Sequence, residues 1–356
     1  MPSRKKRVYK NLSILAVMIK KKKRLPIREF LYGLRYRIGE YCLRGFVLVL
    51  PRIPQRLLLL FTSAAARLTF AILWKYRIRM EENLSMAMGR EFSTAEKRRA
   101  IVRMAWRNFA QGVYETACTL HTSKEKICST VVIQGEEHLR RALEREKGVI
   151  ALSAHLGNFT MIGPRLAAAG YPFSVVVKQP RDQSFARLMD HYRTQLGVKT
   201  IPARPRREAV RQVLGALRSN EVVLLIADEF KSGGVEVEFL GRTAPAPRGP
   251  VTLALRTSAP IVPMFVTRDP ADQLTLHIRP EIDLIKTGDL QEDVTQNVTL
   301  FAHQLEAMVR RYPDQWNWLG FREDGNRLRR KVALSKDTST SQQDHVLPSS
   351  LIKPLP

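Results

Sequence analysis

Residues 148–163, GVIALSAHLGNFTMIG, constrain the fold more than any other stretch of the chain. Residues 149–153, VIALS, are apolar up to the final serine, and His155, Gly157 and Asn158 follow in a tight turn. An apolar run that ends in small and polar residues predicts a central strand of an α/β sheet. Because reactive groups often lie where such strands end, His155 is a candidate general base, the alternative being a turn histidine with a structural role.

Short apolar runs alternate with amphipathic or charged segments through the rest of the chain. The predicted strands are residues 131–134, 149–153, 173–178, 222–227, 261–266 and 274–278. The predicted helices are residues 97–119, 136–146, 184–195, 249–257 and 294–311. Strands that alternate with helices pair in parallel, so the expected fold class is α/β, with a mixed, largely parallel sheet flanked by helices.

The charge of the chain indicates an anionic partner. Its 59 Lys and Arg residues outnumber its 33 Asp and Glu residues, for a formal net charge of +26. Nucleic acid, an anionic membrane surface and a phosphorylated substrate all suit this balance, but no nucleic-acid reader motif is present, which disfavours the first. The three cysteines show no metal-ligand spacing and make no disulfide framework, so neither a metal nor a prosthetic cofactor is expected.

The N-terminal region combines basic clusters with an apolar run. Residues 57–74 form a largely apolar run whose only charged residue is Arg67, and Trp74 and Tyr76 lie at its end among further cations. This length is near the minimum for a bilayer span, and the flanking residues are typical of an interface anchor. Because cations flank both ends, the positive-inside rule selects no spanning orientation. A helix or hairpin that lies in the membrane interface is therefore favoured over a span or a buried helix.

Several motifs, in order, resemble those of the bacterial lipid A late acyltransferases, within the wider lysophospholipid and glycerolipid acyltransferases. They are ENL at 82–84, GEEHL at 135–139, KGVI at 147–150, SAHLGNF at 153–159, the block 235–265 and YPDQWNW at 312–318. With this resemblance, which covers most of residues 40–322, the chain divides into four expected segments. These are a basic arm at 1–37, a membrane-associated helical region at 38–80, a glycerolipid-acyltransferase-like domain at 81–325 and a disordered tail at 326–356.

The resemblance implies a membrane-associated O-acyltransferase with His155 as general base. The implied donor is an acyl carrier protein or coenzyme A thioester, and the implied acceptor is a hydroxyl of an anionic membrane lipid, above all a lipid A precursor. The positive charge suits both an acidic carrier and anionic headgroups. Because thioester donors are cytoplasmic, the expected location is the cytoplasmic face of a bacterial inner membrane.

One residue departs from the family signature, which places Asp or Glu five residues after the histidine. This chain has Thr160 there, and threonine brings no charge to stabilise an imidazolium. Another carboxylate serves, or the enzyme works without one, or the protein is a catalytically inactive lipid-binding relative. Asp228 and Glu229, at the end of the predicted strand 222–227, are the candidate catalytic carboxylates by topology.

The candidate substrate-binding residues lie in three places. Backbone N–H groups and cations near a general base stabilise an oxyanion or bind phosphate, although a solvated basic loop is the alternative for each cation. The candidates are Gly157, Asn158 and Thr160 in the turn after His155, Lys178 and Arg181 after the strand 173–178, and Gly241, Arg242 and Arg248 in the block 235–265.

Overall fold

The computed structural model describes residues 26–230 and 233–321. The predicted basic arm at 1–37 lies partly outside these residues, and the predicted tail at 326–356 lies wholly outside them. The helices are α2 (Pro26–Val49), α3 (Gln55–Ile72), α4 (Trp74–Met88), α5 (Ala95–Thr119), α6 (Lys124–Thr130), α7 (Glu136–Leu143), α8 (Ile162–Ala168), α9 (Gln183–Gln195), α10 (Arg206–Arg218), α11 (Gly249–Thr257) and α12 (Leu290–Arg311). The strands are β1 (Val131–Gln134), β2 (Val149–Ser153), β3 (Phe173–Val177), β4 (Val198–Pro202), β5 (Val222–Ile226), β6 (Val235–Phe239), β7 (Arg242–Ala246), β8 (Ile261–Arg268) and β9 (Leu274–Ile278). Short 3-10 turns occur at η1 (Leu50–Arg52), η2 (Phe159–Met161) and η3 (Pro313–Gln315).

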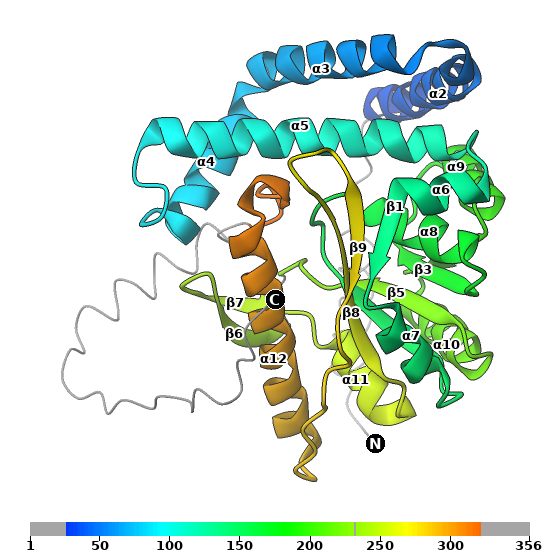
Figure 1. The fold of residues 1–356 in the computed structure, drawn as a ribbon, viewed down its shortest axis with the longest axis vertical. Helices are drawn as coiled ribbons and strands as arrows, with labels where there is room; N and C mark the ends of the chain where they lie inside the picture. The colour runs from blue at the N-terminus through cyan, green and yellow to red at the C-terminus, as the bar shows by residue number, and fades with distance from the viewer. Residues whose placement is uncertain (1–25, 231–232, 322–356) are drawn as a thin grey trace, which may run out of the picture.

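A seven-stranded sheet is the centre of the fold, in the order β1-β9-β8-β2-β5-β3-β4. The five strands from β8 to β4 run parallel, β9 pairs antiparallel with β8, and β1 pairs parallel with β9. The sheet is therefore mixed and largely parallel with helices around it, which confirms the predicted α/β class (Figure 1).

The predicted elements are present, and the structure adds others. The antiparallel β6–β7 hairpin, the edge strand β4 and the helix α10 have no counterpart among the predictions. Strand β4 carries only two buried residues, Val198 and Ile201, separated by more accessible positions. An edge strand of this kind lacks the continuous apolar run that identifies buried parallel strands.

The core lies on both faces of the sheet because side chains of each strand alternate between them. On β2, Ile150 and Leu152 pack into one hydrophobic cluster with residues of α10, α11 and α12. Val149 and Ala151 pack into the other cluster with residues of α7 and α8. All five side chains of β2 are buried, as expected for a strand covered on both sides.

The apolar run at 57–74 is bent in the structure. Helix α3 ends at Ile72, and α4 begins at Trp74 after a bend of 84°. Among the described residues, no one helix has the length and hydropathy for crossing a bilayer, although the bent pair α3 and α4 meets that test when its two halves are combined. Helix α5 begins at a threonine N-cap, with the Thr94 hydroxyl accepting from the Lys97 N–H at 3.2 Å, and lies between α3 and the end of the sheet (Figure 1).

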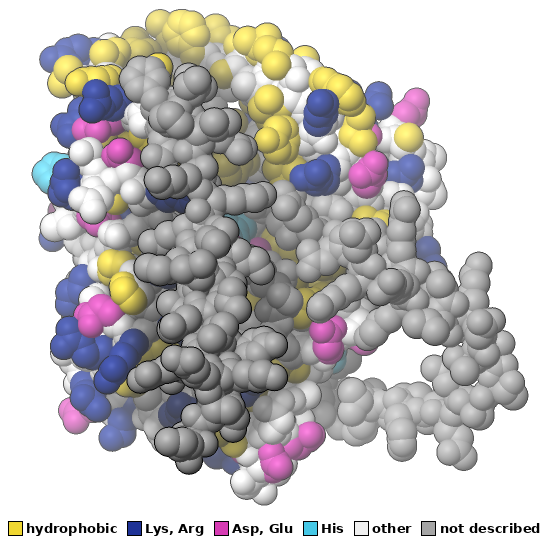
Figure 2. Space-filling model, turned by 180° about the vertical axis from the view of Figure 1, so that it is seen from behind, with side chains coloured by type: hydrophobic (Ala, Val, Ile, Leu, Met, Phe, Trp, Pro, Cys, Tyr) yellow, Lys and Arg dark blue, Asp and Glu magenta, His cyan; other side chains and the backbone are white. Residues whose placement is uncertain are grey.

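Helix α3 turns large hydrophobic side chains outward. Leu60, Phe61, Leu68 and Ile72 are each more than 60% exposed. Figure 2 shows the corresponding band of hydrophobic side chains across the top of the molecule, where α3 lies. Contiguous exposed apolar surface of this kind is unusual for a soluble monomer and is typical of an interaction surface.

Candidate active site

Parallel pairing of β2 with β5 brings two sequence-distant residues together at the carboxyl edge of the sheet. Ser153 is the register partner of Ile226, and the Ala227 N–H donates to the carbonyl of Ser153 at 2.8 Å. Two residues beyond the last paired positions lie His155 and Asp228. Because the carboxyl ends of parallel strands meet at one edge, these two side chains converge.

The carboxylate of Asp228 contacts both the side chain and the main chain of His155. Oδ1 lies 2.7 Å from the imidazole Nδ1, and Oδ2 accepts from the His155 backbone N–H at 2.8 Å. The Asp228 side chain is 3% exposed, whereas that of His155 is 32% exposed. A carboxylate at Nδ1 fixes the proton on that nitrogen and leaves Nε2 as the basic atom.

A third donor reaches the same carboxylate from residues 312–321, the C-terminal segment that follows α12. The indole N–H of Trp316 donates to Asp228 Oδ2 at 3.1 Å, and the Trp316 side chain is buried. The Asn317 N–H donates to the carbonyl of His155 at 3.1 Å, which ties this segment to the turn after β2. The buried carboxylate therefore has three N–H partners, an arrangement that fixes its orientation.

The turn after His155 has no room for a side chain at Gly157. Gly157 has φ +57°, and a Cβ there would overlap the carbonyl oxygen of Val266. The Gly157 N–H donates to the carbonyl of Gln315 at 2.7 Å. The close approach of β8 to this turn thus requires glycine.

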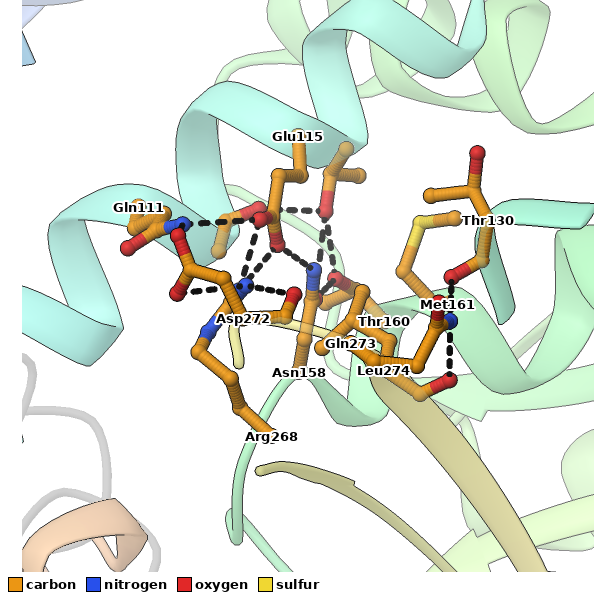
Figure 3. A network of polar contacts seen from close by, with 12 residues as sticks. Gln111, Glu115, Thr130, Asn158, Thr160, Met161, Arg268, Asp272, Gln273 and Leu274 are labelled. Atoms are coloured by element: carbon orange, nitrogen blue, oxygen red, sulfur yellow. Dashed lines mark hydrogen bonds and ion pairs between the residues drawn. The ribbon is translucent and has the colours of Figure 1, made fainter. Parts of the chain in front are cut away.

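Thr160, in the position of the family acid, belongs to a polar network below α5 (Figure 3). Its hydroxyl lies 2.6 Å from the hydroxyl of Thr116 and donates to Asn158 Oδ1 at 2.6 Å. The Asn158 Nδ2 in turn donates to the carboxylate of Glu115 at 2.9 Å. Position 160 is thus bound to α5, and the carboxylate at imidazole Nδ1 is that of Asp228.

The sequence matches the model of the bacterial lipid A biosynthesis acyltransferases over residues 29–322. The chain belongs to this family. The resemblance carried by the six motifs is therefore confirmed, and the histidine of the motif SAHLGNF is the one that lies against Asp228.

Two curated relatives are named for a different lipid. The chain is 29% identical over 185 residues to the phosphatidylinositol mannoside acyltransferase of Mycolicibacterium smegmatis. The aligned region covers 51% of this chain and 59% of that protein. It is 34% identical over 190 residues to the phosphatidylinositol mannoside acyltransferase of Mycobacterium tuberculosis, covering 53% of this chain and 58% of that protein. The matched region thus spans less than two thirds of the length of these curated relatives.

The remaining carboxylate and the first two cations lie at the same edge of the sheet in this family member. Glu229 follows Asp228 and is exposed. Lys178 is exposed directly after β3, and the Arg181 guanidinium carbon lies 5.9 Å from the ring centroid of Tyr32 on α2. Arg181 therefore contacts helix α2.

The three candidate residues of the block 235–265 lie in two different places. Gly241, with φ +71°, makes the turn between β6 and β7, and the Arg242 guanidinium carbon lies 3.9 Å from the ring centroid of Phe321. Arg248 instead donates to Gln291 at 3.2 Å in the first turn of α12. At 1.5 Å per residue, that turn lies roughly 30 Å along the helix from its end beside the C-terminal segment. The structure does not bring Arg248 to the His155–Asp228 pair.

Sequence patterns did not single out Trp316, Glu115 or Arg268 as site residues. Trp316 lies within the motif YPDQWNW, but its contact with Asp228 joins residues 88 positions apart. Glu115 and Arg268 lie on an amphipathic helix and at the end of a strand, where a charged side chain is ordinarily solvated. No local signal distinguishes them.

Proposed function

We propose that this protein is a membrane-associated O-acyltransferase that moves a fatty acyl group from an acyl carrier protein or coenzyme A thioester to a hydroxyl of an anionic membrane glycolipid. The single observation that carries the proposal is the 2.7 Å contact of Asp228 Oδ1 with Nδ1 of His155, a residue of the family motif. His155 is the general base, and Asp228 orients it and stabilises its charge.

The geometry supports one direction of proton movement. Asp228 Oδ1 accepts from Nδ1–H, so the basic lone pair of the imidazole is on Nε2. Nε2 removes the proton from the acceptor hydroxyl as its oxygen attacks the thioester carbonyl carbon. The buried carboxylate of Asp228 then stabilises the imidazolium.

Collapse of the tetrahedral intermediate completes the reaction. The carbon–sulfur bond breaks, the thiolate leaves, and the imidazolium returns its proton to the sulfur. The products are an ester and a free thiol, and His155 is again neutral. Lys178 and Arg181, exposed beyond β3, supply positive charge for the phosphates or acidic carrier of the donor.

The acceptor is a sugar hydroxyl near phosphate. The family name indicates a lipid A precursor, and the two relatives are named for phosphatidylinositol mannoside. Both are anionic glycolipids, which suits a chain with net charge +26. We propose the lipid A precursor as acceptor, with phosphatidylinositol mannoside as the competing substrate in the assay.

The exposed apolar residues of α3 face the membrane in this proposal, with the catalytic domain on the cytoplasmic face of a bacterial inner membrane. Flotation with anionic vesicles tests the surface. Leu60→Glu with Leu68→Glu should abolish flotation, because both side chains are more than 60% exposed on α3. Val210→Glu with Ile285→Glu, two exposed positions elsewhere, is the control that should still float.

Acyl transfer by the purified chain tests the activity. A labelled long-chain acyl-CoA and the matching acyl carrier protein are supplied with each acceptor, and ester formation is measured for the wild type, His155→Ala and Thr160→Ala. His191→Ala, an exposed histidine on α9, is the matched control.

Transfer should disappear with His155→Ala, survive His191→Ala, and fall less than about tenfold with Thr160→Ala, because Asp228 rather than position 160 holds Nδ1. A wild-type protein that binds these lipids but transfers nothing to any of them would instead establish the catalytically inactive relative that Thr160 first suggests.

A further inference from the structure

Glu115 lies at the centre of the network beside the candidate active site, although it comes from α5, outside every motif. Nη2 of Arg268 lies 2.6 Å from each of its carboxylate oxygens. Gln111 Nε2 donates to Oε1 at 3.2 Å, and Asn158 Nδ2 donates to Oε2 at 2.9 Å (Figure 3). Both oxygens are therefore used within the protein.

The ion pair between Glu115 and Arg268 is shielded from water. Their side chains are 17% and 9% exposed. The main chain of Arg268 is fixed as well, because its N–H donates to Gln315 Oε1 at 2.8 Å and its carbonyl accepts from Gln315 Nε2 at 2.6 Å. A shielded, doubly anchored pair of this kind costs desolvation energy and is not explained as a contributor to stability alone.

Asn158 connects this pair to the turn that carries His155. It lies three residues after His155, is 6% exposed, and its carbonyl accepts the Met161 N–H at 2.9 Å as η2 begins. Its Oδ1 accepts from the Thr160 hydroxyl, so the amide of Asn158 connects Glu115 on α5 with Thr160 in η2.

We propose that Glu115 is a positioning residue for the transfer reaction: paired with Arg268, it holds the turn of His155 in place through the amide of Asn158. This inference rests on the proposed function of His155. It assigns Asn158 to the support of the base, and it predicts that loss of the Glu115–Asn158 bond lowers kcat while the KM of the thioester donor stays unchanged.

The decisive variants keep the Glu115–Arg268 ion pair and change only the hydrogen bond between Asn158 and Glu115. Asn158→Ala removes the amide, and Asn158→Asp replaces it with a carboxylate facing Glu115. A displacement of the base by a fraction of an ångström to 1 Å lowers kcat by up to about 100-fold. We expect a loss of that order for both variants near neutral pH, with the donor KM within about twofold of the wild type.

The Asn158→Asp variant has a pH signature that a loss of stability alone would not give. The charged groups facing position 158 are Glu115 on α5, Arg268 on β8 and, beyond them, Asp272 in the β8–β9 turn. Two facing carboxylates share a proton when the pH falls, which restores a hydrogen bond in place of repulsion. The ratio of variant to wild-type kcat should therefore rise roughly tenfold from about pH 8 to about pH 5.5.

Two further variants complete the experiment. Glu115→Gln tests the proposed residue directly and should lose kcat like Asn158→Ala, with thermal unfolding as the check on folding. Glu281→Gln is the matched control: it breaks the 2.7 Å ion pair with Arg145 beside the amino ends of the strands and should leave kcat unchanged.

The outcomes separate this inference from the proposed function. Asn158→Ala and Asn158→Asp with wild-type kcat, a raised donor KM in place of a lowered kcat, or a kcat ratio that does not vary with pH would each overturn the positioning role. In those cases an inactive His155→Ala would still support the proposed function. An active His155→Ala would overturn both.

Discussion

Asp228 binds His155 at two points, its Oδ1 at the imidazole Nδ1 and its Oδ2 at the backbone N–H. The imidazole and the start of its own turn are thereby fixed by a single side chain. Because Asp228 follows the neighbouring strand β5, the orientation of the base depends on strand pairing and not on the spacing within one loop.

Asp228→Asn should reduce acyl transfer by about a thousandfold to ten-thousandfold. The amide keeps the shape and can still accept the His155 N–H, but its NH2 group facing Nδ1 favours the wrong imidazole tautomer. Initial rates with labelled donor measure the loss. Glu229→Gln, at the exposed neighbouring carboxylate, is the control, and an equal loss there would contradict the assignment to Asp228.

Trp316→Phe should lower kcat about tenfold, since it removes a hydrogen bond to a charged group while keeping an aromatic ring. With one donor fewer, the Asp228 carboxylate is less firmly oriented, which lowers kcat, and it pairs more strongly with the imidazolium once that forms. The acid limb of the pH–rate profile should then move to higher pH.

Trp318→Phe is the matched control for that variant. Trp318 is also fully buried, and its indole N–H donates to the Pro313 carbonyl at 2.7 Å. Both variants lose a buried indole and should lose comparable thermal stability, but only Trp316→Phe should shift the pH profile. A shift of equal size in both would mean that the indole of Trp316 has no specific effect on the base.

Gly157→Ala should destabilise the fold by more than ~3 kcal/mol, because the new methyl group overlaps the Val266 carbonyl in a left-handed backbone conformation. Gly241→Ala shares the left-handed conformation but meets no atom within 4 Å, so it should cost only about 1 kcal/mol. Chemical denaturation compares the two. Similar losses would show that the turn after β2 can move away from β8.

His277 should make the free energy of unfolding depend on pH. Burial on β9 lowers its pKa from 6.5, and Arg311 and Arg279 lower it further; its Nε2 lies 2.8 Å from the Thr267 hydroxyl. Because the unfolded chain takes up the proton first, the native state loses stability as the pH falls below about 6.5 and regains it above. His277→Gln should flatten that dependence, as measured by denaturation at a series of pH values; an unchanged slope would assign it to another group.

The sequence by itself determined the fold class, the buried central strand and the family. Residues 149–152 form an unbroken apolar run that ends at Ser153, the pattern expected of a strand buried on both faces, so the position of the strand could be predicted to the residue. The edge strand β4 could not, because one exposed edge relaxes the demand for apolar residues. The turn that contains His155 and Gly157 could also be predicted, because its signal lies within a few neighbouring residues.

Only the tertiary structure decided which groups surround the histidine. Asp228 was a candidate by topology alongside Glu229, and the register of β2 with β5 is what sets its carboxylate against Nδ1. Trp316 reaches the site from the C-terminal segment, and Glu115 reaches it from α5. Their partners are 88 and 43 residues away in the sequence, and a local sequence pattern does not predict contacts over such separations. Local sequence specifies strands and turns through short-range sterics and burial, whereas the partners of a side chain follow from how distant elements pack.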